Sequence, residues 1–203
     1  MSIPTVFISS TREDLQPYRD AARDAAGREG FRFIRMEDFA AAGQPSLEEC
    51  LKRVADADVL IVIVAYCYGS EPEGHDKSYT WLECDEAARL HKEVLPFFVD
   101  KSFRWVWRKE VDHLTEVIDD ATEELLAQVK RNRAKLEDFK NELLIQRTKE
   151  NFTTPEDLWG RVGSALREWR NRRRRTKALT DWEPETSIVA SNSSSDPGPP
   201  LTA

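Results

Sequence analysis

The feature that most constrains this chain is a run of seven apolar residues, Val59 to Ala65 (VLIVIVA), with no polar residue among them. Strands that are buried on both faces have such sequences, and they occur in parallel sheets whose two faces are covered by helices. The apolar stretch ends at Tyr68 after ten residues, whereas a membrane-spanning helix needs about 20. The run therefore predicts a central strand of an α/β sheet, and we expect no association with a membrane.

Four further segments have the composition of strands. Thr5–Ser9 (TVFIS) is short and rich in β-branched residues, and Phe31–Arg35 (FRFIR) alternates apolar with charged residues. Val94–Val99 (VLPFFV) is almost entirely apolar, and Thr148–Phe152 is a candidate for a last short strand. Helical patterns separate the four predicted strands that precede residue 100. The chain therefore predicts a parallel, flavodoxin-like α/β sheet of four to five strands with helices on both faces. In such sheets, ligands bind beyond the carboxyl ends of the strands.

Capping signals mark the start of two helices. Ser46 and Glu49 have the spacing of a capping box, in which each side chain bonds the backbone N–H of the other residue. The stretch Thr154–Asp157 (TPED) supplies a cap residue, a proline at the first helical position and acids in the first turn. We therefore expect helices to begin at these two places.

A strongly charged segment fills much of the second half of the chain. Its apolar residues recur at helical spacing and predict one amphipathic helix that either packs on the sheet or projects as an arm: Leu125, Val129, Leu136, Phe139 and Leu143. We assign residues 1–176 to one α/β domain, with this helical insertion at about 103–147. Residues 177–203 are rich in Ser and Pro and are expected to form a disordered tail or linker.

Composition excludes several classes of function. The 203 residues hold 30 Lys and Arg against 37 Asp and Glu, a net charge of −7, and affinity for nucleic acid comes from clustered cations. Nucleic acid is therefore not an expected partner. The glycine spacing contains no dinucleotide fingerprint and no P-loop, and we expect no secretory signal. Three Cys and three His show no metal-ligand spacing, so we expect reduced thiols, a cytoplasmic location and no bound metal or cofactor.

Two basic stretches leave alternatives open. The run Arg170 to Arg175 has one uncharged residue and is interpreted as the cationic end of a helix, with nucleic acid or anionic lipid as the alternative ligand. Trp105 and Trp107 lie among basic residues, which suits single-stranded nucleic acid or a loop that packs on the sheet.

Glu83 is the candidate catalytic residue. It follows Ser78, Tyr79 and Trp81 in a predicted helix from about Thr80 to Leu90, directly after the central strand and its loop. A carboxylate between aromatic walls suits the cleavage of an N-glycosidic bond, because it can stabilise an oxocarbenium-like centre while the base leaves. An aromatic-lined site also raises the pKa of the carboxyl group. The alternative is that Thr80 and Glu83 form a capping box and that Glu83 only caps its helix.

The first strand is also followed by polar residues. Ser9, Ser10 and Arg12 are candidates for contacts with a phosphate or a ribose near the start of a helix. The alternative is a capped turn, in which Ser10 or Thr11 caps the helix and Asp14 is a first-turn acid.

Three blocks of the sequence resemble a TIR-type domain: VFISSTRED, MEDFAAAGQPSLEECLKRVADADVLIVIVA and SYTWLECDEAARLHKEVLPFFVD. The TIR pattern has a catalytic Glu followed by Ala after four residues, Lys after nine and Pro after thirteen, and Glu83, Ala87, Lys92 and Pro96 fit it. The Trp of that pattern, four residues before the Glu, is Tyr79 here. The motif from Phe152 to Leu158 (FTTPEDL) is similar to the TIR-like family of unknown function found at the N-terminus of STAND-type signalling ATPases.

The resemblance implies a function and a site. Many TIR domains cleave NAD+ at the nicotinamide–ribose bond, so it implies an NAD+ nucleosidase with Glu83 as catalytic carboxylate and NAD+ as candidate substrate. Ser9, Ser10, Arg12, Asp38, Ser78, Tyr79 and Trp81 would bind the substrate. Asp38 lies in the loop that TIR proteins use for self-assembly. The expected context is signalling, immunity or antiphage defence, with self-association or a STAND-type ATPase, in the same chain or a partner chain, as partner.

Two other functions remain open from the sequence. One is a non-enzymatic TIR-like module for oligomerisation or protein interaction, and the other is an N-glycosidic enzyme similar to nucleoside deoxyribosyltransferases. A Glu83 carboxylate buried away from any cleft would argue against both enzymes.

Overall fold

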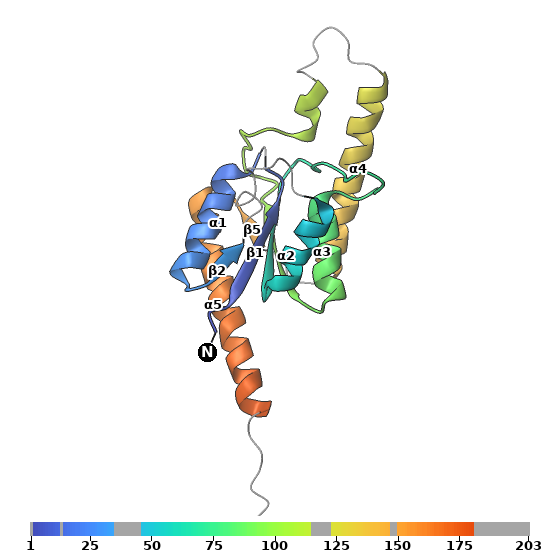
Figure 1. Cartoon of the computed structure of the whole chain (residues 1–203). Helices are drawn as coiled ribbons and strands as arrows, with labels where there is room; N and C mark the ends of the chain where they lie inside the picture. Colours follow the sequence, from blue (N-terminus) through green and yellow to red (C-terminus); the bar gives the residue numbers. More distant parts are fainter. Residues whose placement is uncertain (1, 13, 35–45, 115–122, 147–149, 181–203) are drawn as a thin grey trace, which may run out of the picture. The chain divides into compact units, whose positions relative to one another are not determined.

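Five parallel strands form one sheet with the order β2-β1-β3-β4-β5 in the computed structural model (Figure 1). The structure describes residues 2–12, 14–34, 46–114, 123–146 and 150–180. The elements are β1 (Thr5–Ser10), α1 (Gln16–Arg28), β2 (Arg32–Ile34), α2 (Leu47–Asp56), β3 (Val59–Val64), α3 (Tyr79–Arg89), β4 (Glu93–Val99), the 3-10 helix η2 (Glu110–Leu114), α4 (Glu123–Gln146), β5 (Glu150–Phe152) and α5 (Pro155–Thr180). This is the flavodoxin-like order of doubly wound sheets, and it confirms the predicted fold class.

The chain reverses its direction of progress across the sheet between β1 and β3. From β1 the chain goes outward to β2 and then returns to the other side of β1, where Val6 pairs with Val59 and Ser10 with Ile63. From β3 it continues through β4 to β5. In open α/β sheets, ligands bind at such a switch point, beyond the carboxyl ends of the two strands.

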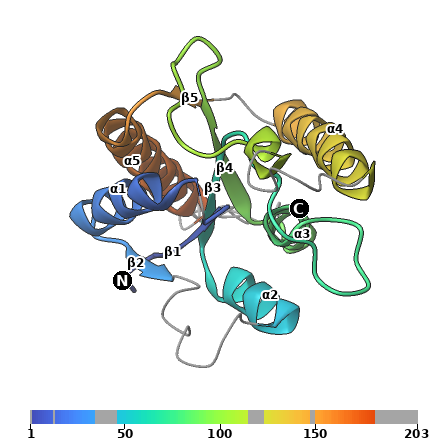
Figure 2. The same ribbon diagram turned by 90° about the horizontal axis from the view of Figure 1, so that it is seen from above.

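The central strand β3 explains the unbroken apolar run, because each of its six residues is buried. Its odd-numbered residues, Val59, Ile61 and Ile63, belong to a core with α1 and the first part of α5. Its even-numbered residues belong to a second core with α2, α3 and α4. Figure 2 shows these two groups of helices on opposite faces of the sheet. Because neighbouring side chains of a strand point to opposite faces, both positions of the alternation must be apolar here.

The charged insertion packs on the domain. Leu136, Phe139 and Leu143 of α4 belong to the second core, with at most 9% of each residue exposed. In the preceding loop, Trp105 is 7% exposed and stacks on Tyr18 with 5.3 Å between ring centroids. The structure therefore favours packing over a projecting arm, and Trp105 lies in a loop tucked against the core.

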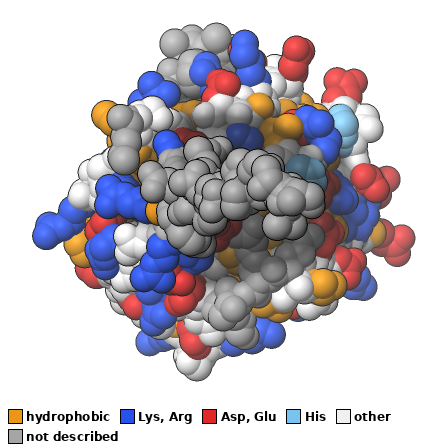
Figure 3. All heavy atoms as spheres, turned by 90° about the horizontal axis from the view of Figure 1, so that it is seen from below, with side chains coloured by type: hydrophobic (Ala, Val, Ile, Leu, Met, Phe, Trp, Pro, Cys, Tyr) orange, Lys and Arg blue, Asp and Glu red, His pale blue; other side chains and the backbone are white. Residues whose placement is uncertain are grey.

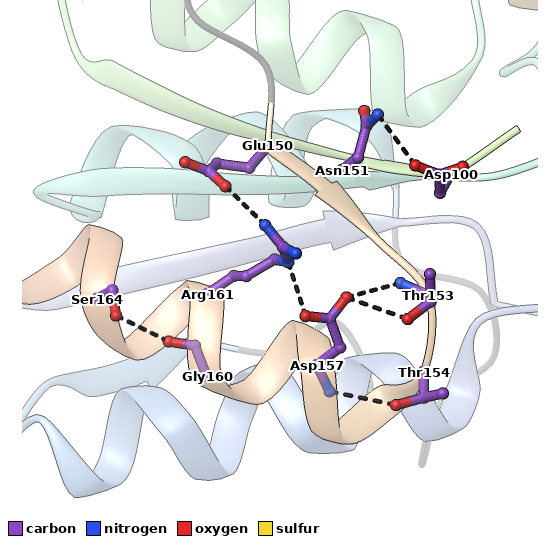
Figure 4. A network of polar contacts seen from close by, with 9 residues as sticks. All are labelled: Asp100, Glu150, Asn151, Thr153, Thr154, Asp157, Gly160, Arg161 and Ser164. Atoms are coloured by element: carbon purple, nitrogen blue, oxygen red, sulfur yellow. Dashed lines mark hydrogen bonds and ion pairs between the residues drawn. The ribbon is translucent and has the colours of Figure 1, made fainter. Parts of the chain in front are cut away.

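Polar contacts fasten β5 to the start of α5 (Figure 4). Asp157 accepts hydrogen bonds from Thr153 N at 2.9 Å and Thr153 Oγ1 at 3.2 Å, and it pairs with Arg161 at 2.8 Å. Thr154 Oγ1 accepts from Asp157 N at 3.2 Å, so Thr154 caps the helix as predicted. The capping box of Ser46 and Glu49 is also present.

Two helix boundaries differ from the sequence prediction. The helix α5 does not end within the arginine run but continues to Thr180, since arginine is a good helix former. The helix α1 begins at Gln16 after Leu15, with no side-chain cap, so the predicted cap at Ser10 or Thr11 is wrong. Thr11 Oγ1 instead donates to Asp14 Oδ1 at 2.5 Å within the loop.

The chain divides into two units, Met1–Trp169 and Arg170–Ala203. The predicted tail, residues 177–203, lies almost entirely outside the described residues. On the face drawn in Figure 3, basic and acidic side chains are interspersed. None of the helices in the described part of the chain is both long enough and apolar enough to cross a membrane.

Candidate functional site

The switch point of the sheet carries a cluster of buried polar side chains. Ser9 and Ser10 are the last residues of β1, and Ser9 is 1% exposed. The loops that follow β1 and β3 contact each other at this edge of the sheet, because a Cβ atom at Gly69 would lie 3.1 Å from Thr11 Cγ2. Polar groups are thus enclosed where an open α/β sheet normally binds its ligand.

Glu83 reaches this cluster from α3. The N-cap of α3 is Ser78, whose hydroxyl accepts a hydrogen bond from Trp81 N at 3.4 Å. Glu83 lies in the second helical turn and is 1% exposed. The capping box of Thr80 and Glu83 considered from the sequence is therefore wrong. The helix does not need the Glu83 carboxylate for its own termination.

The two oxygens of the Glu83 carboxyl group have different surroundings. Ser9 Oγ donates a short hydrogen bond to Oε2. Oε1 is buried and has no hydrogen-bond partner among the described residues, which is uncommon because a buried polar atom without a partner costs free energy. Burial raises the pKa of Glu83 from 4.5 to about 7, and the Ser9 bond and the charge of Arg19 offset only part of this rise.

Arg19 is a member of the cluster that the sequence interpretation missed. It lies on α1 and is 6% exposed, and its Nη1 donates to Ser10 Oγ at 2.7 Å and to Ser10 O at 3.2 Å. A signal was present, since Arg19 falls between Leu15 and Ala22 on the apolar face of the predicted helix.

Cys50 and Tyr79 complete the surroundings of Glu83. The Cys50 thiol on α2 is buried, and burial together with the negative charge of Glu83 raises its pKa to about 12. The thiol is therefore protonated at neutral pH and is no nucleophile. Tyr79, at the first position of α3, is half-buried; burial, followed by the nearby Cys50, raises its pKa.

The comparisons with known proteins place the chain in a family. The model of the family described as "Domain of unknown function (DUF4062)" matches residues 5–167. The chain belongs to the DUF4062 family. No curated protein matches this DUF4062 chain.

Two solved structures illustrate what the DUF4062 chain is similar to. The TIR domains in the structure of the activated Roq1 resistosome directly recognizing the pathogen effector XopQ are 15% identical, with a TM-score of 0.48. That match covers 81% of this chain and 98% of the other. A flavoprotein from Thermotoga maritima is 20% identical, with a TM-score of 0.32, over 70% of this chain and 36% of the other.

Three of the remaining predicted site residues of the DUF4062 domain are Trp81, Arg12 and Asp38. Trp81 is 9% exposed and stacks on Phe139 of α4 with 5.3 Å between ring centroids, while its Nε1 donates to Glu142 at 3.1 Å. It therefore takes part in the packing between α3 and α4, and its role as a substrate-binding residue stays a prediction from the sequence. Arg12 is exposed in the loop after β1. Asp38 lies outside the described residues.

Ser78 and Lys92 serve the architecture of the domain. Ser78 caps α3, and its N–H donates to Tyr68 Oη at 3.0 Å. Lys92 Nζ donates to the carbonyl oxygens of Ala55, at 2.5 Å, and of Ala57 at the C-terminus of α2. The Lys of the TIR-like pattern is thus a helix C-terminal cation in this structure, which complements the dipole of α2.

No group of three or more His, Cys, Asp or Glu side chains within the described ranges is arranged to hold a metal ion. The three cysteines, all within the described residues, are buried and form no disulfide bond.

Proposed function

We propose that this DUF4062 domain cleaves NAD+ at the nicotinamide–ribose bond, with Glu83 as the catalytic carboxylate. The observation that carries the proposal is the position of that carboxylate. It lies at the switch point of the sheet, where Ser9 holds one oxygen and the other has no partner among the described residues. Helix capping does not account for it. The sequence resemblance to TIR domains supplies the substrate class.

The proposed step needs a negative charge beside the ribose. As the C1′–N bond breaks, nicotinamide leaves with the bonding electron pair and becomes neutral, and positive charge develops on the ribose ring. The ionised Glu83 carboxylate stabilises this charge. A water molecule then adds to C1′ and releases one proton, so the products are nicotinamide, ADP-ribose and H+. Because the pKa of Glu83 is about 7, the ionised form and hence the rate increase as the pH rises through 7.

Other side chains have supporting roles in this proposal. Ser9 is a positioning residue that orients the carboxyl group through Oε2. In this proposal Ser10 binds the substrate, and the half-buried Tyr79 supplies an aromatic wall. Arg12 would contact a phosphate from its exposed loop, and Asp38 remains a prediction from the sequence.

Access to Glu83 requires a rearrangement. The side chain is 1% exposed, so a substrate reaches Oε1 only when the segments above the switch point separate. The loops after β1 and β3 meet there through Thr11 and Gly69. We infer that the isolated domain is in an inactive state, and that self-association through TIR-like surfaces or a STAND-type ATPase opens the site.

The same burial favours a second candidate, a non-enzymatic module for protein interaction. An enclosed Glu83 carboxylate cannot contact a substrate, so its burial argues against catalysis by the domain in this conformation. Apolar side chains available to a partner lie elsewhere, for example Val106 at 72% and Trp107 at 40% exposure. This candidate requires no opening of the sheet edge.

Nicotinamide release from NAD+ distinguishes the two functions. Purified protein is incubated with NAD+ over a range of protein concentrations, with its oligomeric state measured by light scattering. We expect turnover that increases with self-association and falls by about 100-fold or more in Glu83→Gln and Glu83→Ala. The matched control is Glu86→Gln, which removes a carboxylate that pairs with Arg89 on the same helix and leaves turnover unchanged.

Three results would contradict the proposal that the domain is an enzyme that uses Glu83. Absence of turnover in every assembled state of the wild type would favour the non-enzymatic interaction module as the function. Undiminished turnover in Glu83→Gln would show that the Glu83 carboxylate is not required for the reaction. An equal loss in Glu86→Gln, or a melting temperature that falls with activity, attributes the effect to folding.

A further inference from the structure

A cavity of about 530 Å³ lies between α4 and the segments that follow β3 and precede η2. Figure 2 shows η2 beside α4. Tyr66, two residues beyond the carboxyl end of β3, contributes an aromatic ring to the wall. The charged side chains that line the cavity are Lys109, Lys130, Arg133, Lys140, Glu110 and Glu137. Four cations thus face two acids. Glu83 is not among the lining residues.

Two of the cations converge on the ring of Tyr66. Lys109 Nζ is 5.3 Å and Lys140 Nζ is 5.5 Å from the ring centroid. The negative face of an aromatic ring attracts a cation, yet the two ammonium groups belong to different segments and repel each other. A convergence of like charges in a cavity is most stable when an anion lies between them.

The two acids are already engaged. Glu110 is 4% exposed, and its carboxylate accepts hydrogen bonds from Tyr68 N at 3.0 Å and Asn132 Nδ2 at 2.7 Å. Glu137 pairs with Lys140 at 3.1 Å. Lys130 and Arg133 form no ion pair within the described residues. The cavity therefore carries a positive charge that its own acids do not neutralise.

The walls of the cavity are held in place before any ligand arrives. Glu110 N donates to Tyr66 O at 3.1 Å, and the bonds of the Glu110 carboxylate join the loop at Tyr68 to Asn132 of α4. Binding therefore needs little ordering of the protein, which favours affinity. Cations at positions 130, 133 and 140 recur at helical spacing along α4 and present several charges in one row.

We propose that this cavity binds a small molecule that carries two phosphate groups, of the size and charge of a nucleoside diphosphate. Its volume lies within the about 300–1,000 Å³ of small-molecule sites. One phosphate group lies between Lys109 and Lys140 beside Tyr66, and the second contacts Arg133 and Lys130. The lining holds two more cations than acids, and a diphosphate supplies enough negative charge to balance this excess, whereas a single carboxylate does not.

Calorimetric titration of the full chain with sodium pyrophosphate and with ADP, both without magnesium, tests the site. We expect saturable binding of one equivalent that weakens with added salt. Arg133→Ala lowers the affinity by about tenfold or more, because a charge-assisted hydrogen bond is lost. Arg131→Ala is the matched control, since it removes the same charge from an exposed position of the same helix outside the cavity. Its affinity stays within about twofold of the wild type.

A double variant, Lys109→Met with Lys140→Met, keeps the aliphatic stems and removes both charges near Tyr66. We expect it to abolish binding of either probe without lowering the melting temperature. The proposal is overturned when neither pyrophosphate nor ADP binds at millimolar concentration, or when Arg131→Ala and Arg133→Ala weaken binding equally. Tighter binding of a short single-stranded oligonucleotide than of ADP would also overturn it, in favour of a nucleic-acid surface.

Discussion

At the scale of single residues, Glu83 links the stability of the domain to pH. Its pKa is raised from 4.5 to about 7 by burial, so the folded state retains a proton that the unfolded chain releases between these two values. The free energy of unfolding therefore falls as the pH rises through this window. Glu83→Gln keeps a hydrogen-bonding partner for Ser9 and does not ionise. We expect the variant to gain roughly 3 kcal/mol over the wild type between pH 4.5 and pH 8 in urea unfolding.

Glu86→Gln provides the opposite control for this measurement. The hydrogen bond from Arg89 lowers the pKa of Glu86, so its contribution is present above the ordinary pKa and is lost as the pH falls. The variant should therefore lose stability relative to the wild type as the pH rises from acid. A constant difference between Glu83→Gln and the wild type across the whole window would show that the Glu83 pKa is not raised in the folded protein.

The sequence identifies Glu83 through its spacing in a pattern, but it does not predict the burial of the carboxylate. Burial depends on where β1 and the loops of the switch point lie in three dimensions. Arg19 and Cys50 were missed because a polar residue on an apolar helix face is normally assigned to packing. The packing of Trp81 against α4 was not predicted for a related reason. An aromatic residue near a candidate site has the same sequence signature whether it lines a pocket or receives a packed helix such as α4.

At the scale of elements, the junction between β5 and α5 depends on one carboxylate. Asp157 binds the backbone and the hydroxyl of Thr153 and pairs with Arg161 (Figure 4). Asp157→Ala removes these contacts at once, and we expect the free energy of unfolding to fall by about 1–2 kcal/mol. Asp138→Ala is the matched control, because Asp138 is an exposed acid of α4. Equal losses in the two variants, measured by urea unfolding, would contradict the role of the junction.

Helix starts could be predicted where the capping residues are adjacent in sequence, as at Ser46 and Thr154. The start of α1 could not, because Thr11 bonds Asp14 in a loop instead of capping a helix. Similarly, the apolar stripe of α4 indicated a helix but did not specify what it packs on. That partner, Trp81 on α3, is 58 positions from Phe139 in the chain.

At the scale of the whole molecule, the two cores lie within the first unit. Among the described residues, every buried member of both cores precedes Arg170, and the last is Trp169 at 4% exposure. Residues 170–203 hold six of the 30 cations and four of the 37 acids, so residues 1–169 carry 24 cations and 33 acids, a net charge of −9. The first unit thus has the apolar burial of a domain, and the arginine run offsets part of its negative charge.

A chain that ends at Trp169 should therefore fold alone. Truncation after Trp169 deletes none of the described members of either core. The stability should be largely retained, because it comes chiefly from buried apolar surface. We expect a single cooperative thermal transition in circular dichroism, with a Tm within about 5 °C of that of the full chain. A chain that ends at Leu158 is the control, because it also removes Val162, Leu166 and Trp169 from the core against α1 and β2. It should not fold cooperatively. Loss of the cooperative transition in the longer variant would instead show that the basic part of α5 is required for the fold.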